Sequence, residues 1–380
     1  MEITTNEKSI IIVARWPVGG IRTYLTYVYT QKEFYDYRLT LITPSQNLKD
    51  YFKNVFLNCN FFYIETGIST AAWVFKIIAR LIKKRPNLLH SHGLTAGLVC
   101  AIPAKILRIP HILTLHDVFL PGTFNDGVLS RIKYKIINVL LKFPTIVNPC
   151  GYDAADNFNA TFPYQGTNRV LPIRNGIDVG KFSNSSIRNL KAELNCDDET
   201  WLIGFFGRFM RQKGFDLLVT TIKSWTRDFP DKPIHVVCFG WGAFIREEQQ
   251  KLNDLKLSNH FSFLDQTNDM ASALRGVDIT VMPSRWEACP LLPMEAMVCG
   301  TPVISSDCIG MKEVCNAGTP VISFRSENQL DLFNKLQFAY ENRKKIRKDA
   351  EAFKYQAVER FDVKMTAKHL SKIFSEVLSP

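Results

Sequence analysis

The strongest constraint on the fold is the alternation of short apolar runs with longer helical patterns along almost the whole chain. The first run is continuously apolar and the others are similar, without the polar alternation of a half-exposed strand, as in strands that are buried on both faces of a parallel sheet. They are Ser9–Ala14, Leu39–Ile42, Leu88–Ser91, Ile112–Leu115, Thr145–Val147, Leu202–Phe206, Ile234–Phe239, Ile279–Met282 and Val303–Ser305. This alternation predicts an α/β protein built on parallel sheets.

The chain is long enough for two such domains. At roughly 100–200 residues per domain, its 380 residues correspond to two. A stretch rich in turn-forming residues, 175–186, precedes a new strand that begins at Trp201. We therefore expect one α/β domain over residues 1–182 and a second over residues 183–361.

Charge is distributed unevenly between these two halves. The formal net charge is +11, of which residues 1–182 carry +10 (21 Lys/Arg against 11 Asp/Glu) and residues 183–380 carry +1 (26 against 25). Between Glu65 and Asp117 there are seven basic residues and no acidic one. The basic half therefore favours an anionic partner: nucleic acid, an acidic membrane surface or a phosphorylated substrate. Because no recognised nucleic-acid module is present, we expect no nucleic-acid partner.

Cysteine usage and the N-terminus favour a reducing compartment. The nine cysteines are scattered without a C-x-x-C pair, which indicates neither a disulfide framework nor a zinc site. Residues 1–8 are polar, unlike a secretory signal, and no apolar run approaches the ~18 residues of a membrane span. We expect a cytoplasmic protein, with the cytoplasmic face of the inner membrane left open as its location.

Two loops that follow strands carry groups suited to an anion. Gly19 and Gly20 lie between a strand and a helix, where the backbone can approach a ligand, although a simple tight turn explains them equally well. Arg208 and Lys213 follow the strand that ends at Phe206. Two cations five residues apart at the carboxyl end of a parallel strand suit a diphosphate; ordinary solvated charges are the alternative.

A third segment combines a helix start with two carboxylates. The residue types predict a helix that begins near Leu291 and closes at Gly300, so the N–H groups of Leu291 and Leu292 face the preceding loop. Glu287 lies in that loop and Glu295 one turn into the helix. Two carboxylates beside an anion-binding helix start suit sugar hydroxyls. The helix dipole alone would account for Glu295, but not for Glu287.

Histidines follow two of the predicted strands. His116 ends the run Ile112–Leu115, and His90 and His92 flank Ser91 at the end of another run. A lone histidine at a strand end is more often structural, but two such ends strengthen a functional interpretation. The chain has no D-x-D, G-x-S-x-G or H-E-x-x-H pattern, which argues against a metal site and against common hydrolases.

Five motifs of this sequence resemble those of family 4 retaining glycosyltransferases, which have the GT-B architecture, and they follow one another along the chain in the order expected for that family. Seven residues separate Glu287 from Glu295, as in the E-x7-E signature of that family. Gly207-Arg208 with Lys213-Gly214 is similar to its phosphate loop, G-R-x-x-x-x-K-G. The other three motifs are the junction Asn175–Phe182, the glycine loop Gly19-Gly20 and the strand-end histidine His116.

The resemblance implies two Rossmann-like domains that face each other across a cleft, and a retaining α-glycosyltransferase that needs no metal. The C-terminal domain would hold a nucleotide-diphosphate sugar and the N-terminal domain a glycan or lipid-linked glycan acceptor, as in bacterial O-antigen, capsule or exopolysaccharide assembly. A last helix within residues 362–380 would cross back to the N-terminal domain. No cofactor is implied, because the nucleotide sugar is a substrate.

The resemblance also assigns roles to individual residues. Arg208 and Lys213 would stabilise the leaving diphosphate, Glu287 and His116 would contact the donor sugar, and Glu295 would bind the ribose hydroxyls. The remaining donor contacts would come from Gly19, Gly20, Gly240, Asp265, Pro290, Leu291 and Leu292.

Two positions depart from the pattern of the family and leave the donor open. Ala288-Cys289-Pro290 replaces the usual glycine-containing sequence after the first glutamate, and Asp265 replaces a glycine. A UDP-sugar is favoured and GDP-mannose stays open. Two other functions also stay open: a related nucleotide-sugar epimerase or hydrolase, and a non-catalytic binding subunit.

The basic half contains two amphipathic patterns that could lie on a membrane. In the first, Lys76, Arg80 and Lys83 share one helical face, whereas Val74, Ile78, Leu81 and Ile82 lie towards the other. In the second, Arg131, Lys135 and Lys142 accompany apolar pairs at 136–137 and 140–141. Basic amphipathic helices bind anionic membranes, so we expect peripheral membrane contact. The alternative is that both helices only cover the sheet.

Overall fold

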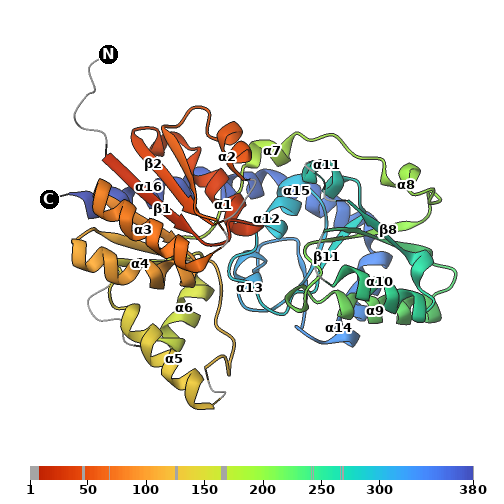
Figure 1. Cartoon of the computed structure of the whole chain (residues 1–380). Helices are drawn as coiled ribbons and strands as arrows, with labels where there is room; N and C mark the ends of the chain where they lie inside the picture. The colour runs from red at the N-terminus through yellow and green to blue at the C-terminus, as the bar shows by residue number, and fades with distance from the viewer. Residues whose placement is uncertain are drawn as a thin grey trace. The chain divides into compact units, whose positions relative to one another are not determined.

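A computed structural model describes residues 8–44, 48–67, 69–124, 127–163, 169–240, 242, 244–265, 267 and 269–379. The polar N-terminal segment, residues 1–7, lies outside them. The chain forms two compact units, each with one parallel sheet and packed helices (Figure 1). The first unit extends to Gly176 and resumes at Val363; the second runs from Ile177 to Asp362.

The division between the units lies six residues before the expected boundary at 182/183. Ile177 pairs with Asp362 in an isolated parallel bridge, and its N–H donates to the Phe361 carbonyl at 2.8 Å. At Gly176 a Cβ atom would overlap with the backbone of Val363, so only glycine fits this crossing. The turn-rich junction therefore joins the second unit as soon as it leaves Gly176.

The first unit contains a seven-stranded parallel sheet in the order β3-β2-β1-β4-β5-β6-β7. The direction of strand order changes between β1 and β4, which is where open α/β sheets bind ligands. The strands are β1 (Lys8–Ala14), β2 (Tyr37–Thr43), β3 (Phe61–Glu65), β4 (Leu88–His92), β5 (His111–Leu115), β6 (Ile146–Pro149) and β7 (Arg169–Val170).

Helices connect these strands and pack on the sheet. They are α1 (Gly20–Tyr29), α2 (Lys49–Val55), α3 (Thr70–Lys84), α4 (Leu94–Leu107), α5 (Gly127–Leu140) and α6 (Tyr152–Thr161), with a short 3-10 turn, η1 (Lys32–Phe34). The last helix of the chain, α16 (Val363–Leu378), also belongs to this unit, where Phe374 packs edge-on against Phe34.

The second unit contains a six-stranded parallel sheet in the order β10-β9-β8-β11-β12-β13. Its strand order reverses between β8 and β11, so the loops after these strands lie side by side. The strands are β8 (Trp201–Phe206), β9 (Ile234–Phe239), β10 (Phe261–Leu264), β11 (Ile279–Met282), β12 (Val303–Ser306) and β13 (Ile322–Phe324).

Nine helices and two 3-10 turns complete the described part of the second unit. The helices are α7 (Val179–Ser183), α8 (Leu190–Glu193), α9 (Phe215–Asp228), α10 (Ile245–Asp254), α11 (Met270–Arg275), α12 (Leu292–Cys299), α13 (Met311–Val314), α14 (Gln329–Glu341) and α15 (Arg343–Phe361). The turns are η2 (Arg211–Lys213) and η3 (Ser258–His260). Each of the nine apolar runs overlaps a strand, which confirms the predicted fold class.

The predicted helix between Leu291 and Gly300 is confirmed as α12. Leu291 is its N-cap, Pro293 lies in its first turn, and Gly300 closes it in the left-handed conformation at φ 72°. Within the described residues, no helix is both long and apolar enough to cross a bilayer.

A cluster of four histidines lies in the first unit, on β4, β5 and the loop after β5; His90, His92 and His111 are buried and His116 is half-buried. His90 bonds Thr114 Oγ1 at 2.7 Å, His111 bonds Ser91 Oγ at 2.7 Å, and His92 Nδ1 lies 3.1 Å from His116 Nε2. Burial lowers the pKa of His111 to about 3 and that of His116 to about 4. Burial, reinforced by neighbouring histidines, holds the pKa values of His90 and His92 well below the ordinary range. The four rings are therefore neutral in the native protein.

This cluster predicts that acid destabilises the first unit. Unfolded histidine has a pKa near 6.5, so below that pH the unfolded state binds more protons than the native state. The opening free energy of β4 and β5 should fall by about 1 kcal/mol per histidine between pH 7.5 and about pH 5.5. Amide hydrogen exchange measures this directly, with β11 and β12, which contain no histidine, as the internal control. Equal pH dependence in both pairs of strands would contradict the prediction.

Candidate active site

Two loops of the second unit are pressed together beyond the carboxyl ends of β8 and β11. Gly214 follows η2 with φ 66°, and a Cβ atom there would overlap with the carbonyl oxygen of Pro283. The Arg285 N–H donates to the Gln212 carbonyl at 2.8 Å across the same boundary. Glycine is required at 214 by both its positive φ and this contact, so packing accounts for the glycine that follows Lys213.

The contact between the loops brings Lys213 against Glu287. Lys213 Nζ lies 2.6 Å from Glu287 Oε1, and the Ser284 hydroxyl donates to the same oxygen at 2.7 Å. Glu287 is 7% exposed, so the ion pair is largely shielded from water and its hydrogen bonds are strong. The other carboxylate oxygen, Oε2, lies 3.5 Å from Gln212 Nε2 and keeps capacity to accept a further hydrogen bond.

The backbone of Glu287 is fixed by the loop after β12. Its N–H donates to the Ile309 carbonyl at 3.0 Å. Gly310, in the same loop, packs against the Glu287 backbone. Its φ is 75°, and a Cβ atom there would overlap with the Glu287 carbonyl oxygen. Three loops thus position this one carboxylate.

Arg285, next to these residues, serves a different purpose. Its guanidinium forms two hydrogen bonds with the Asp216 carboxylate, at 2.9 and 2.7 Å, and a third with Glu327 at 3.0 Å. The bond with Arg285 lowers the pKa of Asp216 below its usual value. Because its N–H groups are hydrogen-bonded to these carboxylates, Arg285 holds the two loops together.

The start of α12 is open to a ligand. No side chain caps its first turn, because the N-cap is Leu291, and Pro293 has no N–H to satisfy. A small cavity reaches this helix start from the ends of β8 and β11. Its lining consists of Phe205, Phe206, Lys213, Val281, Met282, Pro283, Ser284, Glu287, Pro290, Leu292, Pro293 and Met311. A cation, a carboxylate and a bare helix start therefore converge on one cavity, which suits a phosphate ester bearing hydroxyls.

Glu295 lies one turn into α12 and is 9% exposed. Burial raises the pKa of its carboxyl to about 7, and the positive charge of Lys181 opposes this shift. Within the described residues no salt bridge involves this carboxyl, and only burial and the charge of Lys181 act on it, so it can accept hydrogen bonds from hydroxyl groups.

Three further predicted residues lie on neighbouring loops of the same sheet edge. Arg208 is half-buried, and its guanidinium makes no hydrogen bond or ion pair within the described residues. At Gly240, after β9, a Cβ atom would overlap with the Gly207 carbonyl oxygen, so this loop lies against the loop that carries Arg208. Asp265 is exposed directly after β10, the edge strand.

The other three predicted residues belong to the first unit. Gly19, at φ 56°, is the N-cap of α1 and Gly20 is its first residue; nothing lies within 4 Å of a Cβ atom built on either. His116 follows β5, bonded to His92 and packed edge-on against the ring of Tyr24. Sequence reasoning therefore selected residues at the carboxyl ends of both sheets.

Sequence reasoning missed Ser284, Gln212 and Lys181. The first two hold Glu287 and the third acts on Glu295. Ser284 stands three residues before Glu287, a spacing that could have suggested a local hydrogen bond. Gln212 and Lys181 act across contacts between distant segments, for which the sequence offers no signal.

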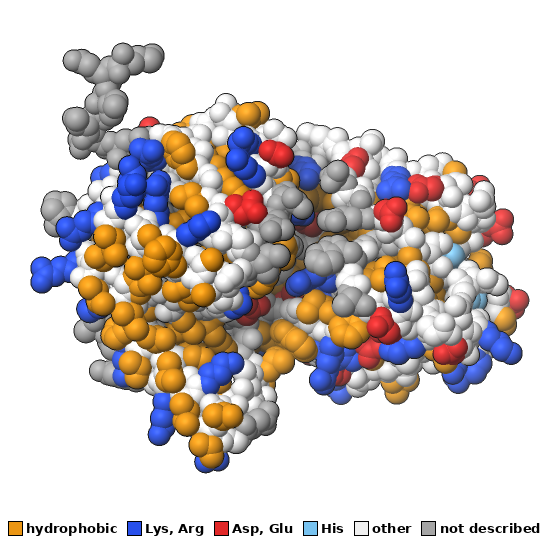
Figure 2. Space-filling model, viewed as in Figure 1, with side chains coloured by type: hydrophobic (Ala, Val, Ile, Leu, Met, Phe, Trp, Pro, Cys, Tyr) orange, Lys and Arg blue, Asp and Glu red, His pale blue; other side chains and the backbone are white. Residues whose placement is uncertain are grey.

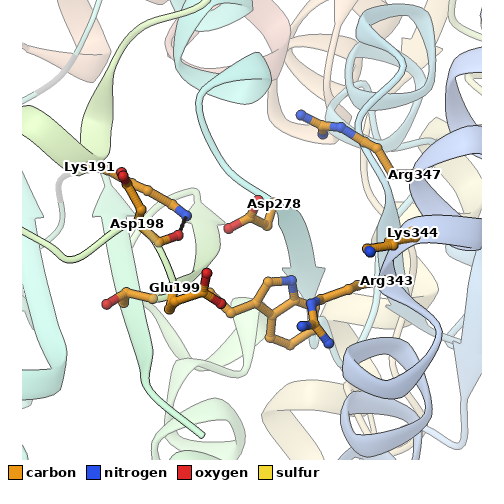
Figure 3. Close-up of a pocket in the computed structure, with 9 residues that line it drawn as sticks. Lys191, Asp198, Glu199, Asp278, Arg343, Lys344 and Arg347 are labelled. Atoms are coloured by element: carbon orange, nitrogen blue, oxygen red, sulfur yellow. Dashed lines mark hydrogen bonds between the residues drawn. The ribbon is translucent and has the colours of Figure 1, made fainter.

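A second cavity lies at the opposite, amino edge of this sheet, beside the first residue of β8 (Figure 3). Its charged lining is Lys191, Asp198, Glu199, Asp278, Arg343, Lys344 and Arg347. The Asp278 carboxylate accepts the Leu202 N–H at 2.8 Å, and Lys191 donates to the Asp198 carbonyl. Ligands of open α/β sheets bind beyond the carboxyl ends, so the cavity at α12 is the better candidate. Within the described residues, no group of three or more His, Cys, Asp or Glu side chains could hold a metal ion.

Two family models match almost the whole chain. One described as "Glycosyltransferase Family 4" matches residues 18–181, and one described as "Glycosyl transferases group 1" matches residues 186–360. The chain is 26% identical over 315 residues to a D-inositol 3-phosphate glycosyltransferase of Corynebacterium kroppenstedtii. The aligned residues cover 77% of this chain and 67% of the relative.

Two further similarities bear on ligands and on the fold. The chain is 24% identical over 236 residues, 60% of each protein, to the UDP-Gal:alpha-D-GlcNAc-diphosphoundecaprenol alpha-1,3-galactosyltransferase of Escherichia coli. It superposes on Anabaena HepE in complex with UDP-glucose with a TM-score of 0.82 at 20% identity, over 97% of this chain and 99% of that one. The latter likeness shows the fold, which is GT-B.

The raised pKa of Glu295 predicts that Glu295→Gln stabilises the protein in alkaline but not in acidic solution. A pKa above the unfolded value means that the native state loses stability as the pH rises from about 4.5 through 7. At pH 8 the neutral amide should add roughly 3 kcal/mol, whereas at about pH 4.5 the difference should vanish. Thermal and urea unfolding at the two pH values measure the effect, with the exposed Glu359→Gln as the matched control. A stability gain that is the same at both pH values would show that burial of the charged carboxylate is not its cause.

Proposed function

Because the chain belongs to the family 4 glycosyltransferases, we propose that it transfers a sugar from a nucleotide-diphosphate donor to a glycan or lipid-linked glycan acceptor with retention of configuration. The observation that carries this proposal is the convergence of Lys213, Glu287 and the uncapped start of α12 on one cavity. The biological setting we propose is the assembly of a bacterial surface polysaccharide, such as O-antigen, capsule or exopolysaccharide.

The leaving diphosphate is stabilised by fixed positive charge and by backbone donors. Lys213 reaches the cavity directly, and Arg208, whose guanidinium has no partner within the described residues, lies on the same loop. The N–H groups of Leu291 and Leu292 add the positive end of α12. Together they neutralise the charge that develops as the bond to the sugar breaks, which is why we propose that no metal is required.

The two buried carboxylates bind hydroxyl groups on either side of the diphosphate. Glu287 uses the oxygen that Lys213 and Ser284 leave available for the donor sugar. Glu295 accepts the ribose hydroxyls, and Gly240 and Asp265 border the base. In the first unit, Gly19 and Gly20 present backbone to the donor, and His116 contacts the sugar near its anomeric carbon.

Retention follows from attack on the same face from which the diphosphate leaves. The acceptor hydroxyl forms the new bond to the anomeric carbon while the bond to the diphosphate oxygen breaks. The leaving phosphate takes the proton of the hydroxyl, so charge and atoms balance without a protein base.

Relatives support a UDP-sugar and a lipid-linked acceptor. HepE was crystallised with UDP-glucose, and the name of the galactosyltransferase specifies UDP-Gal and a diphosphoundecaprenol-linked sugar. We propose the same classes here and keep GDP-mannose as the second donor. All nine cysteines are free thiols, which suits the cytoplasm, and we place the reaction at the cytoplasmic face of the inner membrane.

The choice of donor predicts selective stabilisation by nucleotides. A ligand at a hundredfold its dissociation constant stabilises the native state by about 2.7 kcal/mol, so UDP should raise the melting temperature measurably. GDP should do so less, inorganic phosphate at the same concentration hardly at all, and Glu295→Ala should weaken the response to UDP. Stronger stabilisation by GDP would reassign the donor, and no response to either nucleotide would contradict the proposed site.

The proposed roles of the two cations predict large losses of turnover. Arg208→Ala and Lys213→Ala should each lower the rate of nucleoside diphosphate release by about a hundredfold or more, because charge stabilisation of this kind has that weight. The matched control is Arg211→Ala, an exposed cation on the same loop, which should change the rate by less than about threefold. Excess EDTA should leave the wild-type rate unchanged. Near-normal rates in both variants, or a strict need for Mg²⁺ or Mn²⁺, would contradict the mechanism.

A further inference from the structure

Helices α3, α4 and α5 of the first unit expose an unusual number of large apolar side chains. The most exposed are Leu129 at 82%, Ile106 at 74% and Phe75 at 73%. The others on these helices are Ile82, Ile102, Val128, Ile132, Ile136 and Val139. Helix α4 packs against both α3 and α5, so the nine residues lie on neighbouring helices; we call them the α3–α5 face. Figure 2 shows apolar side chains gathered over this part of the first unit.

The fold does not need these side chains. On α3 the core contacts come from Trp73, Ile77 and Leu81, which are fully buried. The sequence pattern grouped Val74, Ile78, Leu81 and Ile82 on one face of α3. Of these only Leu81 is fully buried, and Ile82 is exposed, as is Phe75. Helix α5 buries only Ile137 among its described residues. Exposed apolar area of this extent is typical of an interaction surface.

The charged residues on helices α3, α4 and α5 are all basic. Residues 66–116 and 127–152 contain no acidic residue. Exposed basic residues lie on or directly after the same helices: Lys83, Lys84, Arg85, Lys105, Arg108, Arg131, Lys133 and Lys135. In Figure 2 basic side chains border the apolar ones. The apolar centre of this face suits the boundary between the lipid headgroups and the acyl chains. The surrounding basic residues suit the negatively charged headgroups of an anionic bilayer.

We propose that the α3–α5 face docks on an anionic phospholipid membrane, with Phe75, Ile106 and Leu129 entering the headgroup–acyl boundary. A second copy of the chain fits poorly, because an isologous contact would bring the two basic rims together without acidic partners. The apolar side chains would insert into the bilayer, and the lysines and arginines would be attracted to the anionic headgroups. Binding therefore needs both kinds of residue. The proposal concerns helices that carry none of the residues assigned to the chemistry above, and it stands independently of that chemistry.

Co-sedimentation with vesicles tests the apolar part. The full chain should bind vesicles of equimolar phosphatidylcholine and phosphatidylglycerol, and bind pure phosphatidylcholine vesicles far less. The combined variant Phe75→Ser, Ile106→Ser, Leu129→Ser should lower the partition coefficient by about tenfold or more. Its matched control alters three exposed side chains of the second unit, Ile187→Ser, Leu330→Ser and Tyr355→Ser, and should bind like the wild type.

The charge part has its own variant and control. The combination Lys83→Glu, Lys105→Glu, Lys135→Glu should also lower partitioning by about tenfold or more, and high salt should abolish most wild-type binding. Lys223→Glu with Lys345→Glu and Lys348→Glu, on exposed lysines of the second unit, should retain binding. Unchanged melting temperatures in all variants separate loss of binding from loss of folding.

Three results would overturn the proposal. The first is no binding of the wild type to the anionic vesicles. The second is binding that both α3–α5 face variants retain, which would place the contact elsewhere. The third is a dimer in solution that the apolar variant converts to monomer without any vesicle binding, which would make the face a contact between copies. Nucleotide-dependent melting of the same variants reports on the proposed active site separately.

Discussion

The close approach of two backbone segments, at Gly214 and Pro283, is the constraint on which the candidate active site depends. It requires a residue without a side chain, and it places an ammonium group on one loop 2.6 Å from a carboxylate on the other. Arg285 then ties the loops together through Asp216. A substitution at Gly214 would separate Lys213 from Glu287 without touching either charged group.

Much of the fold could be predicted because buried parallel strands are continuously apolar. The nine apolar runs do not include β3, β7, β10 and β13, which lie at the edges of their sheets. β7 and β13 have two and three residues, too few to show a pattern, and β3 is only partly buried. Helix α12 was recognisable at both ends, because Pro293 and Gly300 have specific roles at helix termini.

The site and the surface were predictable to different degrees. Arg208, Lys213, Glu287 and Glu295 could be selected from spacing, because strand ends and a helix start place them at one sheet edge. The support from Gln212 could not, because it depends on a side-chain contact between two loops that are 75 residues apart in the sequence. On α3, Trp73, Ile77 and Leu81 are buried whereas Phe75 and Ile82 are exposed, and the apolar pattern of the sequence does not distinguish the two sets.

The pairing of Lys213 with Glu287 has a consequence for selectivity among anions. A small anion that enters the empty cavity meets a negative carboxylate beside the ammonium group, so inorganic phosphate or sulfate gains little by entering. A larger molecule that carries hydroxyls next to its phosphate can satisfy the cation and the carboxylate at once. The Lys213–Glu287 ion pair would therefore favour binding of a hydroxyl-bearing phosphate compound over binding of inorganic phosphate or sulfate.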